Sequence, residues 1–493
     1  MATNARQHDH TIDGSWREGR GDELIAIDPT TGEPSWHGRG ATNEEVDAAV
    51  RAARDAFDSW ASLPLEDRIA HVKRFSDVLK KNETPLLEAI CISTGKPRWE
   101  ATTEVAGLHG KIGVSIQAYA ERCGTKTQDV QGYRATTQFR PHGVCAVLGP
   151  FNLPAHLPHG HIVPALIAGN TIVFKPSEQT PLVGNRMMDI WHDVGLPKGV
   201  INMVQGGRDT GIALSQHAGI DGLFFTGSSS AGLALCRTFA EHPERILALE
   251  MGGNNPLIVD TQHLGDLDAA AYLTVQSAYI TAGQRCTCAR RLIVIESAKR
   301  AAFIERLVAM TKRIRVGKWN DEPQPFYGPV ISAAAAKRVI DAQAELVGRG
   351  ADVLLACKAK KDCPAMLSPG LIDVTGVPAR ADEEVFGPLL QIMRVKDLDE
   401  AITEANDTQF GLSAGLLSDR RGSYDAFARR IRAGVIAWNR QTTGASGQLP
   451  FGGVGKSGNH RPAGYFSADY CSYPVAVYEA DQVTMPSSTT PGL

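Results

Sequence analysis

The chain has 493 residues, of which 43% are hydrophobic and 21% are charged, as expected for a globular protein with two or three domains. The formal charge of −3 and the lack of a Lys/Arg-rich run argue against nucleic acid or another polyanion as a partner. The sequence shows no apolar stretch of signal-peptide length at its start and no run of roughly 18 apolar residues that could span a membrane. We therefore expect a cytoplasmic protein without membrane association. The nine irregularly spaced cysteines argue against a disulfide framework.

The first predicted elements are helices. Thr42 and Glu45, three residues apart, form a capping box that predicts a helix start. Apolar side chains then recur at positions 46, 50, 53, 57 and 60, which is the spacing of one helical face. A second helical region is predicted from about 65 to 93. We expect an interruption near Pro85, because proline lacks the N–H that a helix interior needs.

From residue 144 the pattern changes to short apolar runs that alternate with helical stretches. The runs lie at 144–148, 171–174, 200–204, 222–225 and 246–249, and each is bounded by Gly, Pro or Asn. Strands that alternate with helices imply right-handed crossovers and a parallel sheet, which binds ligands at the carboxyl ends of its strands. The pattern indicates a nucleotide-binding architecture.

A second α/β block is predicted from about 253 to 450, with apolar runs at 291–295, 352–355 and 434–438. Two further segments, near 123–142 and 465–480, are polar or alternate in character.

Cys286 is the candidate nucleophile. It lies in Thr281–Cys288, which reads Thr-Ala-Gly-Gln-Arg-Cys-Thr-Cys, and a thiol there needs a nearby positive charge or dipole to be activated. Taken alone, Cys286 could equally be a buried structural cysteine. Cys288 could share a metal site, but no third or fourth ligand lies near in sequence, so a packing or redox role is favoured.

Two upstream residues complete a set of reactive groups. Glu250 follows an apolar run and precedes Met-Gly-Gly, which suits a general base, although it could also be a solvated strand end. Asn152 lies in Gly-Pro-Phe-Asn-Leu-Pro. A thiol, a carboxylate and a carboxamide are the groups needed to oxidise an aldehyde through a thioester.

Two segments are candidates for binding a dinucleotide. The stretch 227–232 follows an apolar run and precedes a helix, where main-chain N–H groups can hold a pyrophosphate or simply form a helix cap. Lys175 and Glu178 end another run and can present an ammonium and a carboxylate to one ribose, or form a solvated turn. A carboxylate at the ribose would repel a 2′-phosphate, which favours NAD over NADP.

Together these segments resemble the aldehyde dehydrogenase superfamily. The matching segments are 149–154, 175–178, 227–232, 250–253, 283–286, 384–388 and 450–458, in the expected order, with 94–96 and 327–331 as further matches. The resemblance covers nearly the whole chain. It implies an α/β fold with a Rossmann-type NAD-binding domain (1–122 and 143–252), an α/β catalytic domain (253–450) and a small β oligomerisation arm (123–142 and 465–482). It also implies a homo-oligomer, either a dimer or a tetramer.

The resemblance implies roles for individual residues. Cys286 would be the nucleophile, Glu250 the base that activates water, and Asn152 the oxyanion donor, aided by the main-chain N–H of Cys286. No metal is expected. The residues expected to bind NAD are Phe151, Lys175, Glu178, Gly227, Ser228, Ser229, Gly232, Glu384 and Phe386.

Three details narrow the resemblance to the branch that oxidises N-succinyl-L-glutamate 5-semialdehyde in bacterial arginine degradation. They are the histidine-rich stretch 151–161, the string 284–291 and the departure at 457–462. This substrate carries two carboxylates, for which arginine is a suitable partner, so Arg461, with Asn459 and His460, is expected to bind it. The alternatives are another small aldehyde or semialdehyde with NAD(P), a CoA-acylating relative, which Glu250 argues against, and a non-enzymatic protein of the same fold.

Overall fold

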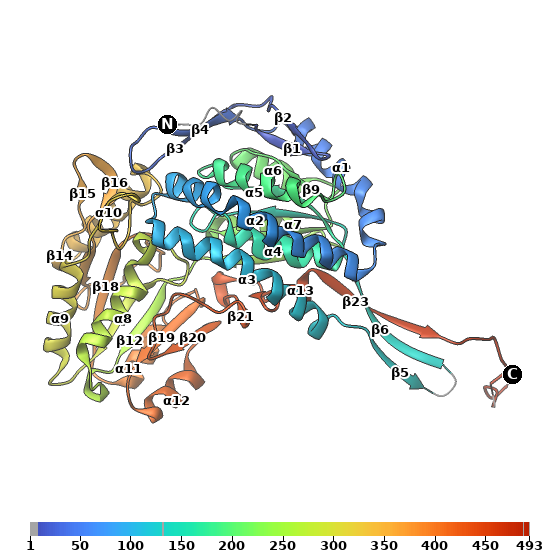
Figure 1. Ribbon diagram of the computed structural model, residues 1–493. Helices are drawn as coiled ribbons and strands as arrows, with labels where there is room; N and C mark the ends of the chain where they lie inside the picture. Colours follow the sequence, from blue (N-terminus) through green and yellow to red (C-terminus); the bar gives the residue numbers. More distant parts are fainter. Residues whose placement is uncertain (1–7, 131–132, 487, 493) are drawn as a thin grey trace.

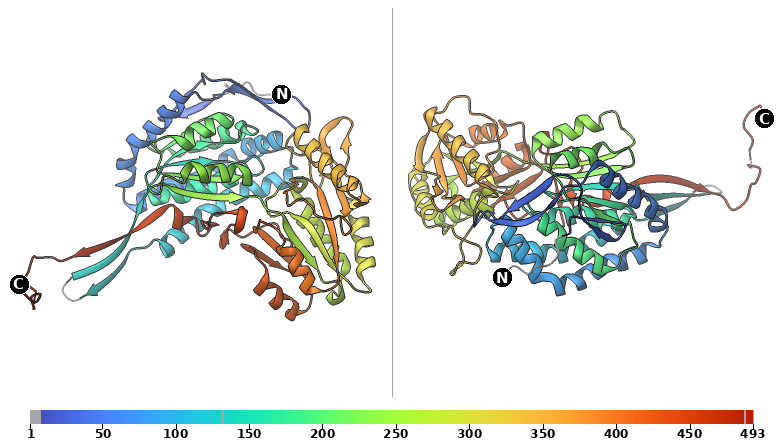
Figure 2. Two further views of the ribbon diagram at one scale, coloured as in Figure 1. Left: turned by 180° about the vertical axis from the view of Figure 1, so that it is seen from behind. Right: turned by 90° about the horizontal axis from the view of Figure 1, so that it is seen from above.

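In this computed structural model, which describes residues 8–130, 133–486 and 488–492, two seven-stranded sheets each form the centre of an α/β half. Figure 1 shows the two halves side by side, with a narrow β arm that projects from the first half on the side away from the second. Both views in Figure 2 show the same arrangement. The predicted α/β class with a separate small β element is confirmed.

The first sheet contains the five strands predicted between residues 144 and 249. Its order is β11 (Ile246–Met251), β10 (Gly222–Gly227), β7 (Val144–Leu148), β8 (Thr171–Lys175), β9 (Ile201–Met203), β1 (His10–Ile12) and β2 (Ser15–Arg17). The first five are parallel, and β1 and β2 add an antiparallel hairpin. The chain moves outward from β7 in one direction to β9 and then in the other through β10 to β11. Ligands bind at the point where such an order reverses.

Helices cover both faces of this sheet because its strands are apolar on both sides. Val144 and Ala146 pack with α1, α6 and α7, whereas Cys145 and Val147 point to the opposite face, with α2 to α5. These helices are α1 (Asn43–Ala61), α2 (Leu65–Thr94), α3 (Arg98–Arg122), α4 (His156–Ala168), α5 (Pro181–Val194), α6 (Arg208–Gln216) and α7 (Ser229–Phe239).

Of the two predictions made for the first helices, the structure confirms the start of α1 and contradicts the break in α2. The capping box of Thr42 and Glu45 is present at the start of α1, as predicted. The interruption expected near Pro85 was wrong, because Pro85 lies inside the continuous helix α2. Lys81, whose carbonyl loses its helical partner there, is exposed to solvent, so water can bind the freed oxygen.

The second sheet has the order β14 (Asp352–Leu355), β17 (Gly370–Asp373), β18 (Leu389–Val395), β13 (Ala289–Ile295), β12 (Asn255–Val259), β19 (Ser413–Leu417) and β20 (Val435–Trp438). All neighbours are parallel except β14, which runs antiparallel to β17. Its helices are α8 (Leu267–Tyr279), α9 (Arg300–Lys312), α10 (Ala333–Gly348), α11 (Leu398–Asn406) and α12 (Arg421–Arg430).

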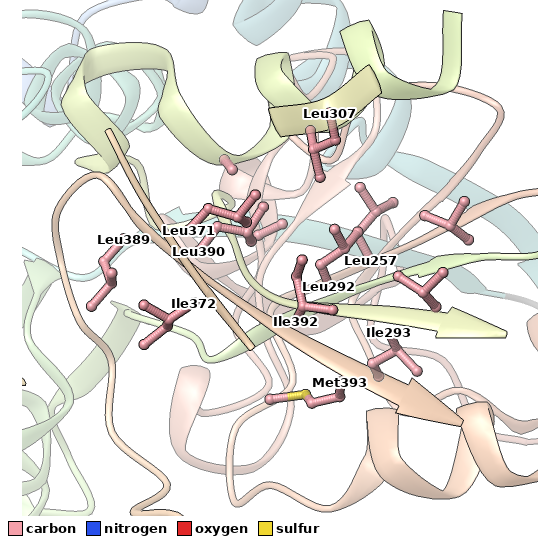
Figure 3. Packing of buried hydrophobic residues seen from close by; sticks show 14 of the residues in the cluster. Leu257, Leu292, Ile293, Leu307, Leu371, Ile372, Leu389, Leu390, Ile392 and Met393 are labelled. Carbon is pink, nitrogen blue, oxygen red and sulfur yellow. The ribbon is translucent and has the colours of Figure 1, made fainter. Parts of the chain in front are cut away.

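One continuous apolar core surrounds the second sheet. Figure 3 shows Leu307 of α9 above the sheet and Met393 of β18 below it, with Leu292 and Ile293 of β13 on opposite sides. This alternation buries side chains on both faces, so β13, which follows the Cys286 loop directly, is rigidly held.

The arm is a three-stranded antiparallel sheet of β5 (Lys126–Val130), β6 (Tyr133–Pro141) and β23 (Ser472–Glu479), in which β6 is central. Residues 131 and 132 of the predicted arm lie outside the described residues. The segment before β23 forms α13 (Ser467–Tyr470), which packs on α3 and α4. Three short hairpins complete the fold: β3 (Glu23–Ile27) with β4 (Pro34–Arg39), β15 (Ala359–Lys360) with β16 (Cys363–Leu367), and β21 (Pro450–Phe451) with β22 (Ala463–Gly464).

Candidate active site

A cleft of about 1170 Å³ runs along the carboxyl ends of the first sheet to the second half. Asn152 after β7, Glu250 in β11 and Cys286 before β13 all line it. The fold therefore brings together three residues that are separated by up to 134 positions in the sequence. The thiol, the carboxylate and the carboxamide share one space with the candidate dinucleotide-binding residues.

The loop that carries Cys286 has an unusual backbone. Thr281, Ala282 and Gly283 all have positive φ values, of 57°, 52° and 72°. Two of these are not glycine, and residues with side chains adopt this conformation rarely and at a cost. Asn255 holds the other side of the loop, because its Nδ2 donates to the main-chain oxygens of Cys286 (2.6 Å) and Cys288 (2.9 Å). The loop position is thus imposed by its surroundings.

Cys286 is a protonated thiol in this state. Burial raises its pKa to about 12, the carboxyl groups of Glu384 and Glu250 act in the same direction, and only Arg290 opposes them. The neighbouring Arg285 does not activate the sulfur, because its guanidinium donates to Glu100 (2.8 Å) and Thr281 (2.8 Å). The thiolate must therefore form during the reaction rather than exist beforehand.

Asn152 is fixed by two hydrogen bonds. Its Nδ2 donates to the main-chain oxygen of Gln284 (2.9 Å), and its own main-chain oxygen accepts from Lys96 Nζ (2.6 Å). Lys96 also pairs with the buried Glu104 at 2.7 Å, and Glu104 accepts from two main-chain N–H groups at the start of α4. An amide nitrogen carries two hydrogens, so the second N–H of Asn152 can serve an oxyanion.

Glu250 is buried at the end of β11. Its Oε1 accepts a hydrogen bond from the main-chain N–H of Ala463 (3.2 Å), whereas its Oε2 is buried without a partner among the described residues. Burial raises the pKa of this carboxyl well above its usual range, and the Ala463 hydrogen bond opposes the shift only in part. A carboxyl with such a pKa can take a proton from water and keep it.

Lys175 and Glu178 line the cleft beyond β8. Lys175 is buried, and its Nζ donates to the main-chain oxygens of Pro176 (2.8 Å) and Gly206 (2.7 Å) and lies 3.8 Å from Glu178. Burial lowers the pKa of Lys175, and Glu178 opposes that shift. Glu178 is exposed at the cleft surface, where its carboxylate can accept hydrogen bonds from a ribose.

The turn from β10 into α7 also lines the cleft. Ser228 caps α7, since its Oγ accepts from the N–H of Ala231 (3.3 Å), and Gly227 and Ser228 both border the cleft. Ser229 and Gly232 are not among the lining residues. Gly232 instead permits α7 to approach β11, because a Cβ there would collide with the side chain of Met251. Their contact with a cofactor stays a prediction.

Glu384, Phe386 and Phe151 line the cleft near the thiol. Phe151 and Phe386 contact edge to face, with ring centroids 5.9 Å apart. Arg290 lies between them and the loop: its guanidinium is 3.4 Å from Glu384, 5.2 Å from the Phe386 ring centroid, and donates to the main-chain oxygens of Gly283 and Arg285. Burial raises the pKa of Glu384, and Arg290 opposes the shift.

The three predicted substrate residues do not line the cleft. Both ends of the Asn459 amide bind the main chain of β11, through the oxygen of Leu247 (2.8 Å) and the N–H of Leu249 (3.0 Å). His460 and Arg461 are exposed, and Arg461 donates only to the main-chain oxygen of His460 (3.2 Å). Asn459 thus ties its loop to the strand that carries Glu250. Substrate binding by these residues stays a prediction.

Sequence reasoning did not assign roles to Arg290, Asn255, Lys96 or Glu104. All four hold the reactive residues in place through partners that are remote in sequence. Two of them lay in segments that the sequence had singled out, Arg290 in the string 284–291 and Lys96 in the segment 94–96.

Two negative findings apply to the part of the chain that the structure describes. No group of three or more His, Cys, Asp or Glu side chains is arranged to hold a metal ion there. The Cys288 thiol faces the main-chain oxygen of Ile280, 3.8 Å away. Within the same residues, no helix combines the length and the apolar character needed to cross a membrane.

Comparisons with known proteins agree with this site. The model of the aldehyde dehydrogenase family matches residues 16–476. An N-succinylglutamate 5-semialdehyde dehydrogenase from Ectopseudomonas mendocina (strain ymp) is 52% identical over 484 residues, which are 98% of this chain and 99% of the relative.

Solved structures show the same fold with different cofactors. The 1-pyrroline-5-carboxylate dehydrogenase from Thermus with bound NAD has a TM-score of 0.90 and 29% identity, covering 97% of this chain and 93% of its own. The NADP-dependent glyceraldehyde-3-phosphate dehydrogenase from Bacillus halodurans has a TM-score of 0.88 and 28% identity, covering 97% and 100%. The shared fold alone therefore does not separate NAD from NADP.

Gly283→Ala should strain the Cys286 loop. The residue has a φ of 72°, and a Cβ there would collide with the main-chain oxygen of Gly387. We expect the free energy of unfolding to fall by about 1–3 kcal/mol, measured by urea denaturation. The control is Gly113→Ala in α3, where a Cβ meets nothing within 4 Å. That change should raise stability by up to about 1 kcal/mol, and equal effects from the two variants would contradict the assigned strain.

Proposed function

The chain belongs to the aldehyde dehydrogenase family, and from that membership we propose that it oxidises N-succinyl-L-glutamate 5-semialdehyde to N-succinyl-L-glutamate with NAD, a step of arginine degradation. The observation that carries the proposal is the 52% identity, over nearly the whole of both chains, to a relative named for this reaction. The cleft supports it, because Asn152, Glu250 and Cys286 line the same space.

In the proposed reaction, the Cys286 thiol passes its proton to water in the cleft as the sulfur bonds to the aldehyde carbon. The carbonyl oxygen becomes an oxyanion, which the free N–H of the Asn152 amide and the main-chain N–H of Cys286 stabilise. Donors of this kind each contribute roughly 3–4 kcal/mol to lowering such a barrier. The hydrogen bond to Gln284 keeps the Asn152 amide aimed during this step.

Water then releases the acid. Loss of hydride from the adduct leaves a thioester on Cys286, and Glu250 removes a proton from the water that attacks it. The C–S bond breaks and the sulfur regains a proton, so one aldehyde and one water yield one carboxylate, two protons and one hydride, for which bound NAD would be the acceptor. The partner-free Oε2 of Glu250 is the atom available to receive that proton.

The residues along the cleft fit a dinucleotide. The start of α7 at Ser228 presents main-chain N–H groups and the positive end of a helix dipole, which suit a pyrophosphate. Lys175 and Glu178 would hold the adenosine ribose, and Glu384 with Phe386 and Phe151 the nicotinamide end. When bound, NAD supplies the hydride acceptor.

We assign the domains as the resemblance implies: 1–122 and 143–252 to NAD binding, 253–450 to catalysis, and 123–142 with 465–482 to oligomerisation. The arm carries exposed tyrosines at 133, 473 and 478, with exposed fractions of 39%, 42% and 71%. Such residues favour association of the arm with a second copy in a homo-oligomer. The proposed use of NAD is consistent with a cytoplasmic location.

The Cys286→Ser variant should have lost the oxidation of N-succinylglutamate 5-semialdehyde that the wild-type protein carries out. The assay follows the absorbance of the reduced cofactor. NAD binding should persist, because the sulfur is not part of the ribose or pyrophosphate sites. Cys288→Ser is the matched control and should keep most of the activity, since that thiol faces Ile280. An active Cys286 variant beside an inactive Cys288 variant would reverse the assignment of the nucleophile.

Glu250→Gln should still give a burst of reduced cofactor, because acylation precedes the step that Glu250 serves. Steady-state turnover should then fall by about 10²–10⁴-fold. In the wild type, burial raises the pKa of Glu250, so the carboxyl is protonated at low pH and turnover should rise as pH increases through that pKa. Loss of the burst itself would show that Glu250 acts before the thioester forms.

The wild-type protein should use NAD in preference to NADP, because the Glu178 carboxylate would repel a 2′-phosphate. Glu178→Ser should reduce the ratio of kcat/KM for NAD to that for NADP at least about 10-fold, through loss of a charged hydrogen-bond acceptor. Glu345→Ser, which removes another acidic residue that lines the cleft, should leave the ratio unchanged. A wild-type preference for NADP would refute the role of Glu178.

A further inference from the structure

Lys111 is a buried cation without a counterion. It lies in α3 with 7% of its surface exposed, and its Nζ makes a single hydrogen bond, to the main-chain oxygen of Gly464 (3.1 Å). No ion pair joins it to a carboxylate anywhere in residues 8–130, 133–486 and 488–492. An ammonium group has three N–H donors, so two are left unused.

An unpaired charge of this kind is costly, since burial removes the hydration of the ammonium group and the single carbonyl contact replaces it only in part. Burial lowers the pKa of Lys111 to about 8, which still leaves it mainly cationic at neutral pH. Lys96 is the informative contrast, because it is equally buried but is paired with Glu104 at 2.7 Å. The fold therefore pairs Lys96 with a carboxylate and leaves the charge of Lys111 without such a partner among the described residues.

The side chain of Lys111 occupies a shaped space between two helices. Gly160 of α4 lies opposite it, and a Cβ at Gly160 would lie 3.6 Å from Lys111 Cε. One turn away the relation is reversed: His156 of α4 lies over Gly107 of α3, and a Cβ at Gly107 would be 2.8 Å from His156 Nδ1. We call these four residues the α3–α4 seam.

His156 adds a second unused polar group to the seam. Its Nδ1 is buried and has no hydrogen-bond partner among the described residues. Burial lowers the pKa of His156, the carboxylate of Glu104 opposes that shift, and Lys111 and Arg285 act in the same direction as burial, so the pKa stays below its ordinary value. A neutral imidazole can still donate one hydrogen bond to a carboxylate.

The seam starts beside the reactive groups. His156 is the first residue of α4 and follows Asn152 by four positions, and Arg285, which also acts on His156, precedes the nucleophile. The Gly464 oxygen that binds Lys111 belongs to the residue after Ala463, whose N–H binds Glu250. The seam residues do not line the dinucleotide cleft.

The spacing suits the substrate of the proposed function. In an extended N-succinylglutamate 5-semialdehyde, the two carboxylates lie roughly 5 and 10 Å from the aldehyde carbon at standard bond lengths. Within α4, Gly160, which faces Lys111, lies about one turn, or roughly 5–6 Å, beyond His156, so the two anion-binding groups are separated by about the distance between the two carboxylates.

We propose that Lys111, together with His156, binds a carboxylate of the substrate and thereby makes the enzyme selective for anionic semialdehydes. The proposal rests on the proposed function. It places the inner anion contact in the α3–α4 seam, whereas Arg461, which is exposed, would serve at most the outer carboxylate.

The test uses two variants of the full-length protein and two pairs of substrates. Lys111→Met removes the charge, and Lys111→Gln removes the charge but keeps a donor for the Gly464 oxygen. N-succinylglutamate 5-semialdehyde is compared with pentanal, and succinic semialdehyde with butanal, since each pair contrasts an anionic with a neutral aldehyde. Both variants should raise KM for the anionic members about 30-fold or more while kcat changes little, and the neutral members should be unaffected.

Arg461→Met is the matched control, because it removes an exposed cation from the nearby loop, and it should have the smaller effect on KM. Equal losses on anionic and neutral aldehydes in both Lys111 variants would show a structural role in holding the Gly464 hairpin, and would overturn the proposal. An unchanged KM for the anionic members would also overturn it. The proposed function fails separately, if the wild type prefers succinic semialdehyde to butanal but does not oxidise N-succinylglutamate 5-semialdehyde.

Discussion

The hydrogen bond from Asn152 Nδ2 to the main-chain oxygen of Gln284 joins the two halves of the molecule at the reactive centre. Asn152 follows a strand of the first sheet, whereas Gln284 belongs to the loop that leads into the second. The position of the amide relative to the thiol is thus a property of the packing between the halves. Lys96 binds the main-chain oxygen of Asn152, and Asn255 binds the loop just beyond Gln284, at Cys286 and Cys288. The left-handed residues before Gln284 let the loop reach across.

The same burial that fixes this geometry sets the protonation of the site. The pKa values of Cys286, Glu250 and Glu384 are all raised, and burial is the largest cause for each. Arg290 is the one cation that opposes this effect at both Cys286 and Glu384. The resting site therefore holds a neutral thiol and a carboxyl that binds protons tightly.

The cationic side chains around the reactive centre differ in whether a carboxylate of the protein pairs with them. Arg285 and Lys96 are each paired with a carboxylate, Glu100 and Glu104, and so act as supports for the loops they touch. Lys111 lies near them but is left without such a partner. Because Arg285 and Lys96 are neutralised by carboxylates of the protein, Lys111 is the cation left to pair with a carboxylate of the substrate, as proposed above.

The sequence alone determined the five parallel strands of the first sheet, the capped start of α1 and the order of the motifs around Cys286, Glu250 and Asn152, because periodicity and capping are local properties. Pro85 was misjudged, since only the structure shows that α2 continues through it at a turn where Lys81 is exposed. The orientation of Arg285, the use of the Asn459 amide by β11, and the supports at Arg290 and Asn255 were decided by tertiary structure. Each has a partner between 31 and 212 residues away, so no local pattern encodes these contacts. The isolation of Lys111 is of the same kind, because the lack of a carboxylate around a buried group is a property of everything packed against it.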